Sequence, residues 1–121
     1  MSWRSLFAVA VGGMLGASLR LAIDALLPHE PSEFPLSTLL INIVGSFALG
    51  VLVARVWPVA PEWLRAGLGA GLVGTFTTFS ALTVSLVALG FTPIAALYLL
   101  LSVGGGLATA LLGLRMGRRR A

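Results

Sequence analysis

The sequence predicts an all-α membrane protein with four transmembrane helices, of which the third is broken. Of its 121 residues, 58% are hydrophobic and only 10% are charged, whereas a soluble domain usually carries about 25% charged residues. Four apolar stretches reach the roughly 20 residues needed to cross a bilayer. The connections between them are short and contain prolines, which favours a single transmembrane domain over residues 1–121.

The four predicted spans cover about residues 6–27, 36–57, 63–89 and 94–114. The last three begin just after a proline, which the first helical turn tolerates because its amides have no intrahelical partner. Residues 6–27 are interpreted as a span rather than a signal peptide, because no small-residue cleavage site with a soluble mature chain follows. Gly12 and Gly16, and the run Gly104 to Gly106, predict close helix packing. A bundle this tight has little internal volume, so we expect an oligomer.

The arginines predict the orientation of the chain. Four spans place both termini and the second loop on one side, which holds Arg4, Arg55, Arg65, Arg115, Arg118, Arg119 and Arg120, against Arg20 on the other. The positive-inside rule then predicts a multi-pass protein of the cell membrane with both termini in the cytoplasm. A cluster of C-terminal arginines is also found in proteins that bind nucleic acid. Beside a span, however, such a cluster is typical of a topology anchor, so no nucleic-acid partner is expected.

The inventory of chemically active side chains is small. There is no cysteine, and the single histidine, His29, lies in a polar loop. The acidic residues are Asp24, Glu30, Glu33 and Glu62, and none lies in the middle of an apolar run. Acid–base catalysis and a side-chain metal site are therefore not expected, and the chain is predicted not to be an enzyme.

The segment GTFTTFS, Gly74 to Ser80, places hydroxyls and a glycine in the middle of the third span. Hydroxyls compete for backbone carbonyls and weaken a helix, so we predict a break near Thr75 to Thr78. Carbonyls freed by a break are hard ligands that suit a cation such as Na⁺. Phe76 and Phe79 would flank the break and offer their electropositive ring edges to a small dehydrated anion.

Other polar residues at depth extend the candidate site. Asn42, with Ser46 one turn away, needs a partner helix or water. Tyr98, Ser102, Gly106 and Thr109 form one stripe of the fourth span. For Ser102 and Thr109 the alternative is a bond to the carbonyl four residues earlier, and for Tyr98 it is an interfacial aromatic.

Arg20 and Asp24 share a face at the outer end of the first span. They form either an ion pair that reaches the membrane interface or a charged vestibule that attracts anions.

Three ordered motifs connect these features: GGMLGASLR (12–20), STLLINIVGSFALG (37–50) and GLVGTFTTFSAL (71–82). In this order, and in a chain of this length, they resemble the CrcB family of small fluoride channels, also called Fluc. The resemblance implies a four-helix subunit that dimerises antiparallel, with two fluoride pathways and a central structural Na⁺. It assigns the Na⁺ to the backbone carbonyls of Gly74 and Thr77. It places Asn42, Phe79, Ser80, Tyr98 and Ser102 along the fluoride path and Arg20 in the vestibule.

Three positions depart from the family pattern. Leu82 stands where the family usually has a second phenylalanine, Ala81 replaces a threonine, and Gly106 replaces a hydroxylated residue. Together with the arginine bias, these departures raise the alternative of a fixed-orientation subunit that pairs with an inverted paralogue.

The resulting interpretation is a fluoride-selective channel that releases cytoplasmic fluoride by passive flow, with fluoride and membrane lipid as its other partners. A small proton-coupled multidrug-type exporter would need a carboxylate at mid-membrane, which the spans lack. A purely structural membrane subunit would leave Asn42 and the predicted break unexplained.

Overall fold

The computed structural model describes residues 2–28 and 34–119, and most of them are helical. In chain order the elements are α1 (Trp3–Leu26), α2 (Leu36–Val51), η1 (Leu52–Val56), α3 (Glu62–Ala66), η2 (Gly67–Val73), α4 (Gly74–Phe76), α5 (Ser80–Leu89) and α6 (Pro93–Arg119), where η marks a π-helical segment. The described residues contain no strand. The predicted all-α class is therefore confirmed.

Four helices are long and apolar enough to cross a membrane, namely Trp3–Leu26, Leu36–Val56, Glu62–Leu89 and Pro93–Arg118. They agree with the predicted spans to within a few residues at most ends. The largest difference is at α6, which continues past residue 114 to Arg119. Hydropathy marks only the part of a helix that lies in lipid, whereas the arginines that follow are good helix formers.

Local side-chain bonds and one glycine set several helix ends. The Ser2 hydroxyl accepts a hydrogen bond from the Ser5 amide at 3.1 Å and caps α1. The Thr92 hydroxyl accepts one from the Ala95 amide at 3.2 Å at the start of α6. Gly90 ends α5 with a φ of 64°, a conformation that side chains other than glycine rarely adopt. The tight turn at Gly90 lets α5 and α6 form a helical hairpin.

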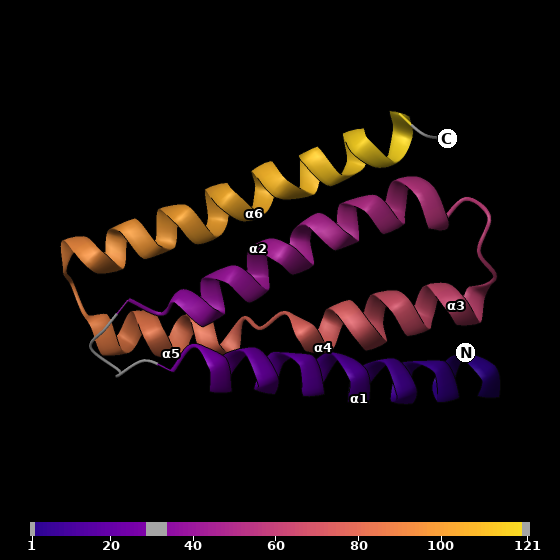
Figure 1. Ribbon diagram of the computed structural model, residues 1–121, viewed down its shortest axis with the longest axis horizontal. Helices are drawn as coiled ribbons and strands as arrows, with labels where there is room; N and C mark the ends of the chain where they lie inside the picture. The colour runs from indigo at the N-terminus through magenta and orange to yellow at the C-terminus, as the bar shows by residue number, and fades with distance from the viewer. Residues whose placement is uncertain (1, 29–33, 120–121) are drawn as a thin grey trace.

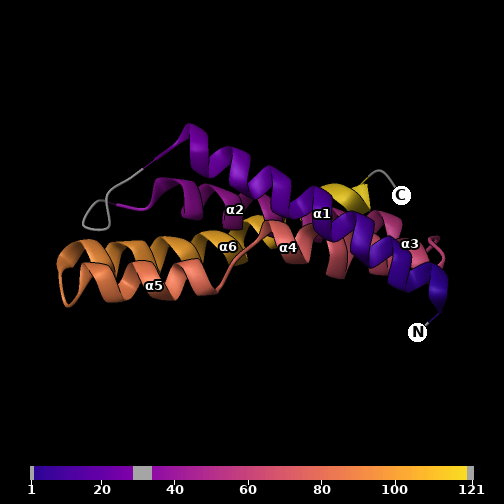
Figure 2. The same ribbon diagram turned by 90° about the horizontal axis from the view of Figure 1, so that it is seen from below.

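The helices lie roughly along one long axis, with α1 packed on η2 and α4, and α2 packed on α6 (Figure 1). Both termini and the turn between η1 and α3 lie at one end of the molecule (Figure 1). This arrangement confirms that the four spans bring the termini and the second loop to one side. After the break in the third span, α5 leaves α1 and runs beside α6 (Figure 2).

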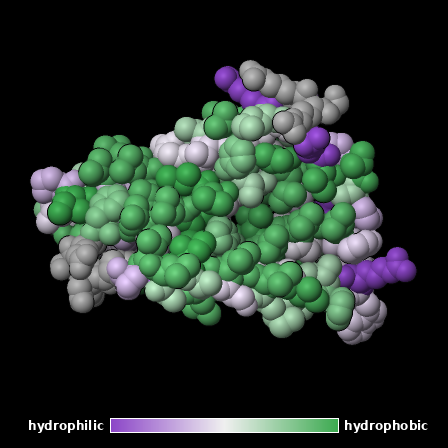
Figure 3. Space-filling view, viewed as in Figure 1, coloured by the Kyte–Doolittle hydropathy of each residue, from purple (hydrophilic) through white to green (hydrophobic). Residues whose placement is uncertain are grey.

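Most of the surface is apolar, unlike that of a soluble protein. Hydrophobic side chains cover the middle of the face seen in Figure 3, and the most hydrophilic ones gather toward the end that carries both termini. The buried hydrophobic cluster is small and consists of Leu39, Leu82, Leu89, Ala95 and Tyr98. Apolar side chains that face outward on every span indicate contact with lipid or with other membrane protein.

Glycines bring two helix pairs into backbone contact. A Cβ at Gly12 would collide with the Gly67 carbonyl, and one at Gly50 would collide with the Ala110 carbonyl. The predicted packing role of Gly12 is therefore confirmed. The run Gly104 to Gly106 does not make the closest approaches of α6, since a Cβ at Gly104 would meet no atom within 4 Å. That role falls to Gly113, where a Cβ would collide with the Phe47 carbonyl.

Candidate functional site

The third span is interrupted between α4 and α5. The Thr77 amide still donates to the Val73 carbonyl at 3.0 Å, but Thr77 itself has extended backbone, with φ −78° and ψ 158°. The next helix begins at Ser80. The predicted break is confirmed, and it lies at residues 77–79, slightly beyond the expected Thr75 to Thr78. Thr75 stays helical, and its hydroxyl donates to carbonyls of its own span and of α1, those of Gly71 at 2.7 Å and Gly13 at 3.0 Å.

Asn42 of α2 holds the interrupted backbone. Its Nδ2 donates to the Thr78 carbonyl at 3.0 Å, and its Oδ1 accepts from the Thr78 amide at 2.8 Å. One carboxamide thus pairs with both polar backbone groups of a residue outside any helix. Asn42 was expected to bond another helix or water. It does bond the third span, but its partner is the non-helical Thr78. Because the amide carries a second N–H, one donor of Asn42 stays available.

The same contacts free the two carbonyls that were assigned to a cation. In an uninterrupted helix the Gly74 carbonyl would accept from the Thr78 amide and the Thr77 carbonyl from the Ala81 amide. Here the Thr78 amide donates to Asn42, and the Ala81 amide donates to the Thr78 hydroxyl at 3.1 Å. Both carbonyls therefore lose their helical donors and keep the oxygen lone pairs that a hard cation requires.

An open pocket of about 270 Å³ lies against the break. Its lining brings together the predicted residues Asn42, Thr77 and Phe79 with residues that were not assigned to the site; the complete lining is Asn42, Gly45, Ser46, Leu49, Val73, Thr77, Thr78, Phe79 and Leu82. The Phe79 side chain is 76% exposed, so its ring contributes little to the packing of this chain. The ring is therefore left for lipid, a second subunit or a ligand to cover.

Tyr98 and Ser102 form a second polar group, on α6. Tyr98 is fully buried with 0% exposure, and its ring packs edge-on against Phe34 at a centroid distance of 5.6 Å. The hydroxyls of Thr38, Ser85 and Ser102 lie around the Tyr98 hydroxyl, but among the described residues neither the Tyr98 nor the Ser102 hydroxyl completes a hydrogen bond. The interfacial alternative for Tyr98 is therefore wrong, and Ser102 does not make the alternative bond to a backbone carbonyl.

Leu82 separates the two polar groups. It lines the pocket with Asn42 and Phe79, and it also belongs to the buried cluster that contains Tyr98. The sequence departure at Leu82 thus falls between the pocket and the buried hydroxyls. A leucine at this place offers hydrophobic bulk without a polar or electropositive edge.

The remaining predicted residues do not line the pocket. The Thr109 hydroxyl lies within 3.2 Å of the carbonyl oxygens of Gly105, Gly106 and Ile43, to which it donates. The bond to Gly105, four residues earlier, is the alternative considered for Thr109. Ser80 lies with its hydroxyl 3.3 Å from that of Thr78, and Phe76 is half-buried near Gly45. Arg20 is half-buried on α1. Within the described ranges no ion pair joins Arg20 to Asp24, which speaks against the paired interpretation.

Sequence reasoning missed Thr78, which is the partner of Asn42 and the cap of α5. It also missed Thr38 and Ser85, which face Tyr98 from other helices. A sequence signal for Thr78 was present. A threonine just before a helix can accept a hydrogen bond from an amide of the first turn, here that of Ala81. No sequence signal pointed to Thr38 or Ser85, since their role depends on which helices are neighbours.

The fold and the site together define a small multi-pass membrane protein with a pocket at a helix break near the middle of its third span. The family model described as "CrcB-like protein, Camphor Resistance (CrcB)" matches residues 7–114, so the chain belongs to this family.

Similar proteins are named as fluoride channels. The chain is 39% identical over 115 residues to "Fluoride-specific ion channel FluC 2" of Ligilactobacillus salivarius, covering 93% of this chain and 84% of the relative. It is 43% identical over 113 residues to "Fluoride-specific ion channel FluC" of Azotobacter vinelandii, covering 88% and 91%. A relative with the same name from Idiomarina loihiensis is 50% identical over 86 residues, covering 69% and 66%. These names describe ion channels and not enzymes, in agreement with the inventory of side chains.

Proposed function

We propose that this chain forms a fluoride-selective channel through which cytoplasmic fluoride leaves the cell by passive flow. The observation that carries the proposal is the pocket at the break, which both Asn42 and the exposed Phe79 line. The names of the relatives support the choice of ion. Hydrogen fluoride crosses a membrane uncharged and dissociates inside, so a passive path for the anion is enough to prevent its accumulation.

In this proposal, hydrogen-bond donors replace the water around the ion. The second N–H of Asn42 and the ring edge of Phe79 would receive fluoride at the break. The Tyr98 and Ser102 hydroxyls, which have no partner among the described residues, would take it over farther along the path. Unpaired buried donors are costly in a protein that has no use for them. A narrow path lined by few donors favours the small anion over chloride.

A structural Na⁺ belongs to the same proposal. The carbonyls of Gly74 and Thr77 would hold it, because both have lost their helical donors at the break. The freed Gly74 and Thr77 oxygens of one chain make two ligands, and a hard cation takes about six. A second copy in the opposite orientation would bring the same two carbonyls to the same depth and so improve the ligand set. The cation would bind carbonyls from the broken third spans of both subunits and so hold the two breaks together.

The antiparallel dimer has independent support from the exposure of the break. Of the three residues of the break, Phe79 is exposed and Thr77 is half-buried in a single chain, and non-helical backbone at membrane depth does not face lipid. A second subunit would cover this surface. Either a copy of this chain or an inverted paralogue would do so, and the arginine bias favours the paralogue.

Single-cysteine labelling decides between these two partners, since the chain has no native cysteine. Val59 and Phe91 are exposed residues in the loops at opposite ends of the bundle. With an impermeant reagent on intact cells, labelling at Phe91→Cys alone is expected for a fixed orientation with cytoplasmic termini. Comparable labelling at both positions would indicate dual topology and a homodimer, and the paralogue would be abandoned.

Fluoride efflux from loaded liposomes tests the function itself. We expect efflux that requires a counter-ion path, such as K⁺ with valinomycin, and that is much slower for chloride under the same gradient. A proton-coupled multidrug-type exporter would instead give no valinomycin-dependent fluoride efflux in the absence of a pH gradient. Purified protein that releases no fluoride, alone or after mixing with a paralogue, would refute the proposal.

A further inference from the structure

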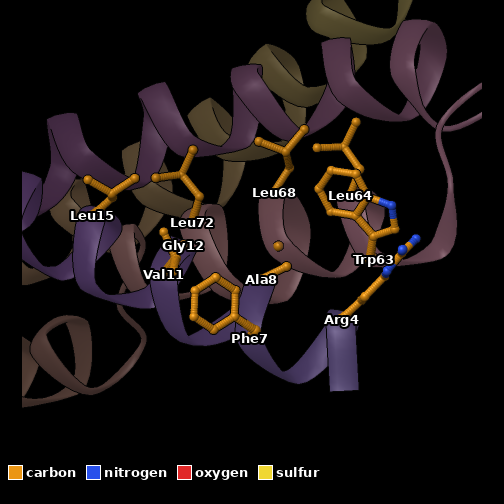
Figure 4. A pocket seen from close by; sticks show the side chains of 11 residues that line it. Arg4, Phe7, Ala8, Val11, Gly12, Leu15, Trp63, Leu64, Leu68 and Leu72 are labelled. Atoms are coloured by element: carbon orange, nitrogen blue, oxygen red, sulfur yellow. The ribbon is translucent and has the colours of Figure 1, made fainter. Parts of the chain in front are cut away.

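A second concave surface lies away from the break, between α1 and the first part of the third span. This groove has a volume of about 480 Å³, and its walls are apolar except at one end (Figure 4). Its floor is made of small residues, because Gly12 and Gly67 let the two backbones touch. Larger side chains such as Phe7 and Leu68 stand at its sides. The groove is thus a direct result of close glycine packing between helices that carry bulky neighbours.

The polarity of the groove changes along its length. Figure 4 shows Arg4 beside Trp63 at one end and Leu15 with Leu72 at the other. None of the lining residues is acidic. Arg4 lies at the end of the molecule that carries both termini (Figure 1), where the third span also begins. The charged end is therefore placed where a membrane surface would lie, and the apolar end points toward the interior of the bilayer.

The length of the groove matches one leaflet. Arg4 and Leu15 are eleven residues apart in one helix, which corresponds to about 16 Å at 1.5 Å per residue. Half of a hydrocarbon core about 30 Å thick is about 15 Å. Tryptophan is enriched at the level of the headgroups, and Trp63 lies at that end. A chain that entered the groove from the Arg4 end would reach the middle of the bilayer.

We propose that this groove binds one acyl chain of an anionic phospholipid, whose phosphate is held by Arg4 and whose headgroup lies beside the Trp63 indole. An arginine near the surface of an anionic membrane contributes about 1 kcal/mol, which corresponds to an about fivefold preference over a zwitterionic lipid. The proposal does not depend on the transported ion or on the break. A competing occupant is a second copy of this chain, which would bury the groove and exclude lipid.

The test uses Trp63 as the reporter, with Trp3 and Trp57 replaced by phenylalanine in the full chain. The protein is reconstituted in phosphatidylcholine vesicles that contain either phosphatidylglycerol or phosphatidylcholine with brominated acyl chains. Quenching of Trp63 is measured against the mole fraction of the brominated lipid. We expect phosphatidylglycerol to quench with about fivefold higher apparent affinity. Arg4→Gln should abolish this preference, and Val11→Phe, which narrows the groove, should reduce quenching by both lipids.

Arg65→Gln is the matched control, because it removes one arginine of α3 at the same end of the molecule without changing the groove lining. It should keep the preference for phosphatidylglycerol. Equal loss in Arg4→Gln and Arg65→Gln would mean general surface attraction and overturn the site. Quenching that ignores the headgroup would also overturn it. Failure of both brominated lipids to quench would indicate that a second copy covers the groove. None of these readouts uses fluoride flux, so they stand apart from the channel proposal.

Discussion

Replacing Asn42 by leucine removes the side chain that pairs with both backbone groups of Thr78. Two hydrogen bonds, of 3.0 and 2.8 Å, are lost, and Thr78 is buried, with 8% exposure. A buried polar group without a partner costs about 1–3 kcal/mol, so two such groups give about 2–6 kcal/mol. The Thr78 amide can in part return to the Gly74 carbonyl, its helical acceptor. We therefore expect the free energy of unfolding to fall by about 2–4 kcal/mol.

The free energy is measured by SDS titration in mixed micelles, followed by tryptophan fluorescence, together with hydrogen exchange at the Thr78 amide. Ser46→Ala is the matched control, because Ser46 lines the same pocket one helical turn from Asn42. Its effect should stay below about 0.5 kcal/mol. If Asn42→Leu is as stable as the wild type and exchange at Thr78 is unchanged, the carboxamide does not hold the break, and the reasoning is refuted.

Three further predictions concern single side chains. Phe79→Ile keeps bulk but removes a ring edge, so fluoride flux in liposomes should fall about two- to tenfold while stability changes by less than about 0.5 kcal/mol. Tyr98→Phe removes a hydroxyl that has no partner among the described residues, so stability should change by less than about 1 kcal/mol while flux falls. Gly50→Ala places a Cβ against the Ala110 carbonyl and should cost about 1–3 kcal/mol, whereas Gly104→Ala should be neutral or stabilising by up to about 1 kcal/mol.

A specific result would contradict each of these predictions. Normal flux in both Phe79→Ile and Tyr98→Phe would reduce the two rings to packing residues. A large loss of stability in Tyr98→Phe would mean that its hydroxyl has a partner after all. Equal unfolding curves for the two glycine variants would contradict the backbone contact between α2 and α6.

The fold was predictable because lipid imposes a simple rule on sequence. A span must be apolar for about 20 residues, so hydropathy alone places all four helices. The break was predictable from Thr75, Thr77 and Thr78, whose hydroxyls compete for backbone carbonyls. Its position is less certain from sequence, because every threonine in the run is an equal candidate. The Gly13 carbonyl, which accepts from the Thr75 hydroxyl, belongs to another helix, so this contact cannot be seen in the sequence.

The site was predictable only in part, because its residues depend on which helices meet. Asn42 and Phe79 stand out as unusual in apolar runs, and the structure places both at one pocket. Thr109 follows the same stripe as Tyr98 and Ser102, yet its hydroxyl is used by nearby carbonyls. Helical periodicity identifies a shared face but not the partner of each hydroxyl. That partner depends on sub-ångström positions of neighbouring backbones, which a pattern of residue types does not contain.

The break also changes the electrostatics of the third span. An unbroken helix carries its partial charges at its two ends, near the membrane surfaces. Here the carboxyl end at Phe76 and the amino end at Ser80 are separated by only three residues near the middle of the span. A region of about half a negative charge and one of about half a positive charge are therefore placed side by side at depth. A single interruption thus provides a neighbourhood where a cation and an anion can both be favoured, although no ionisable side chain lies there.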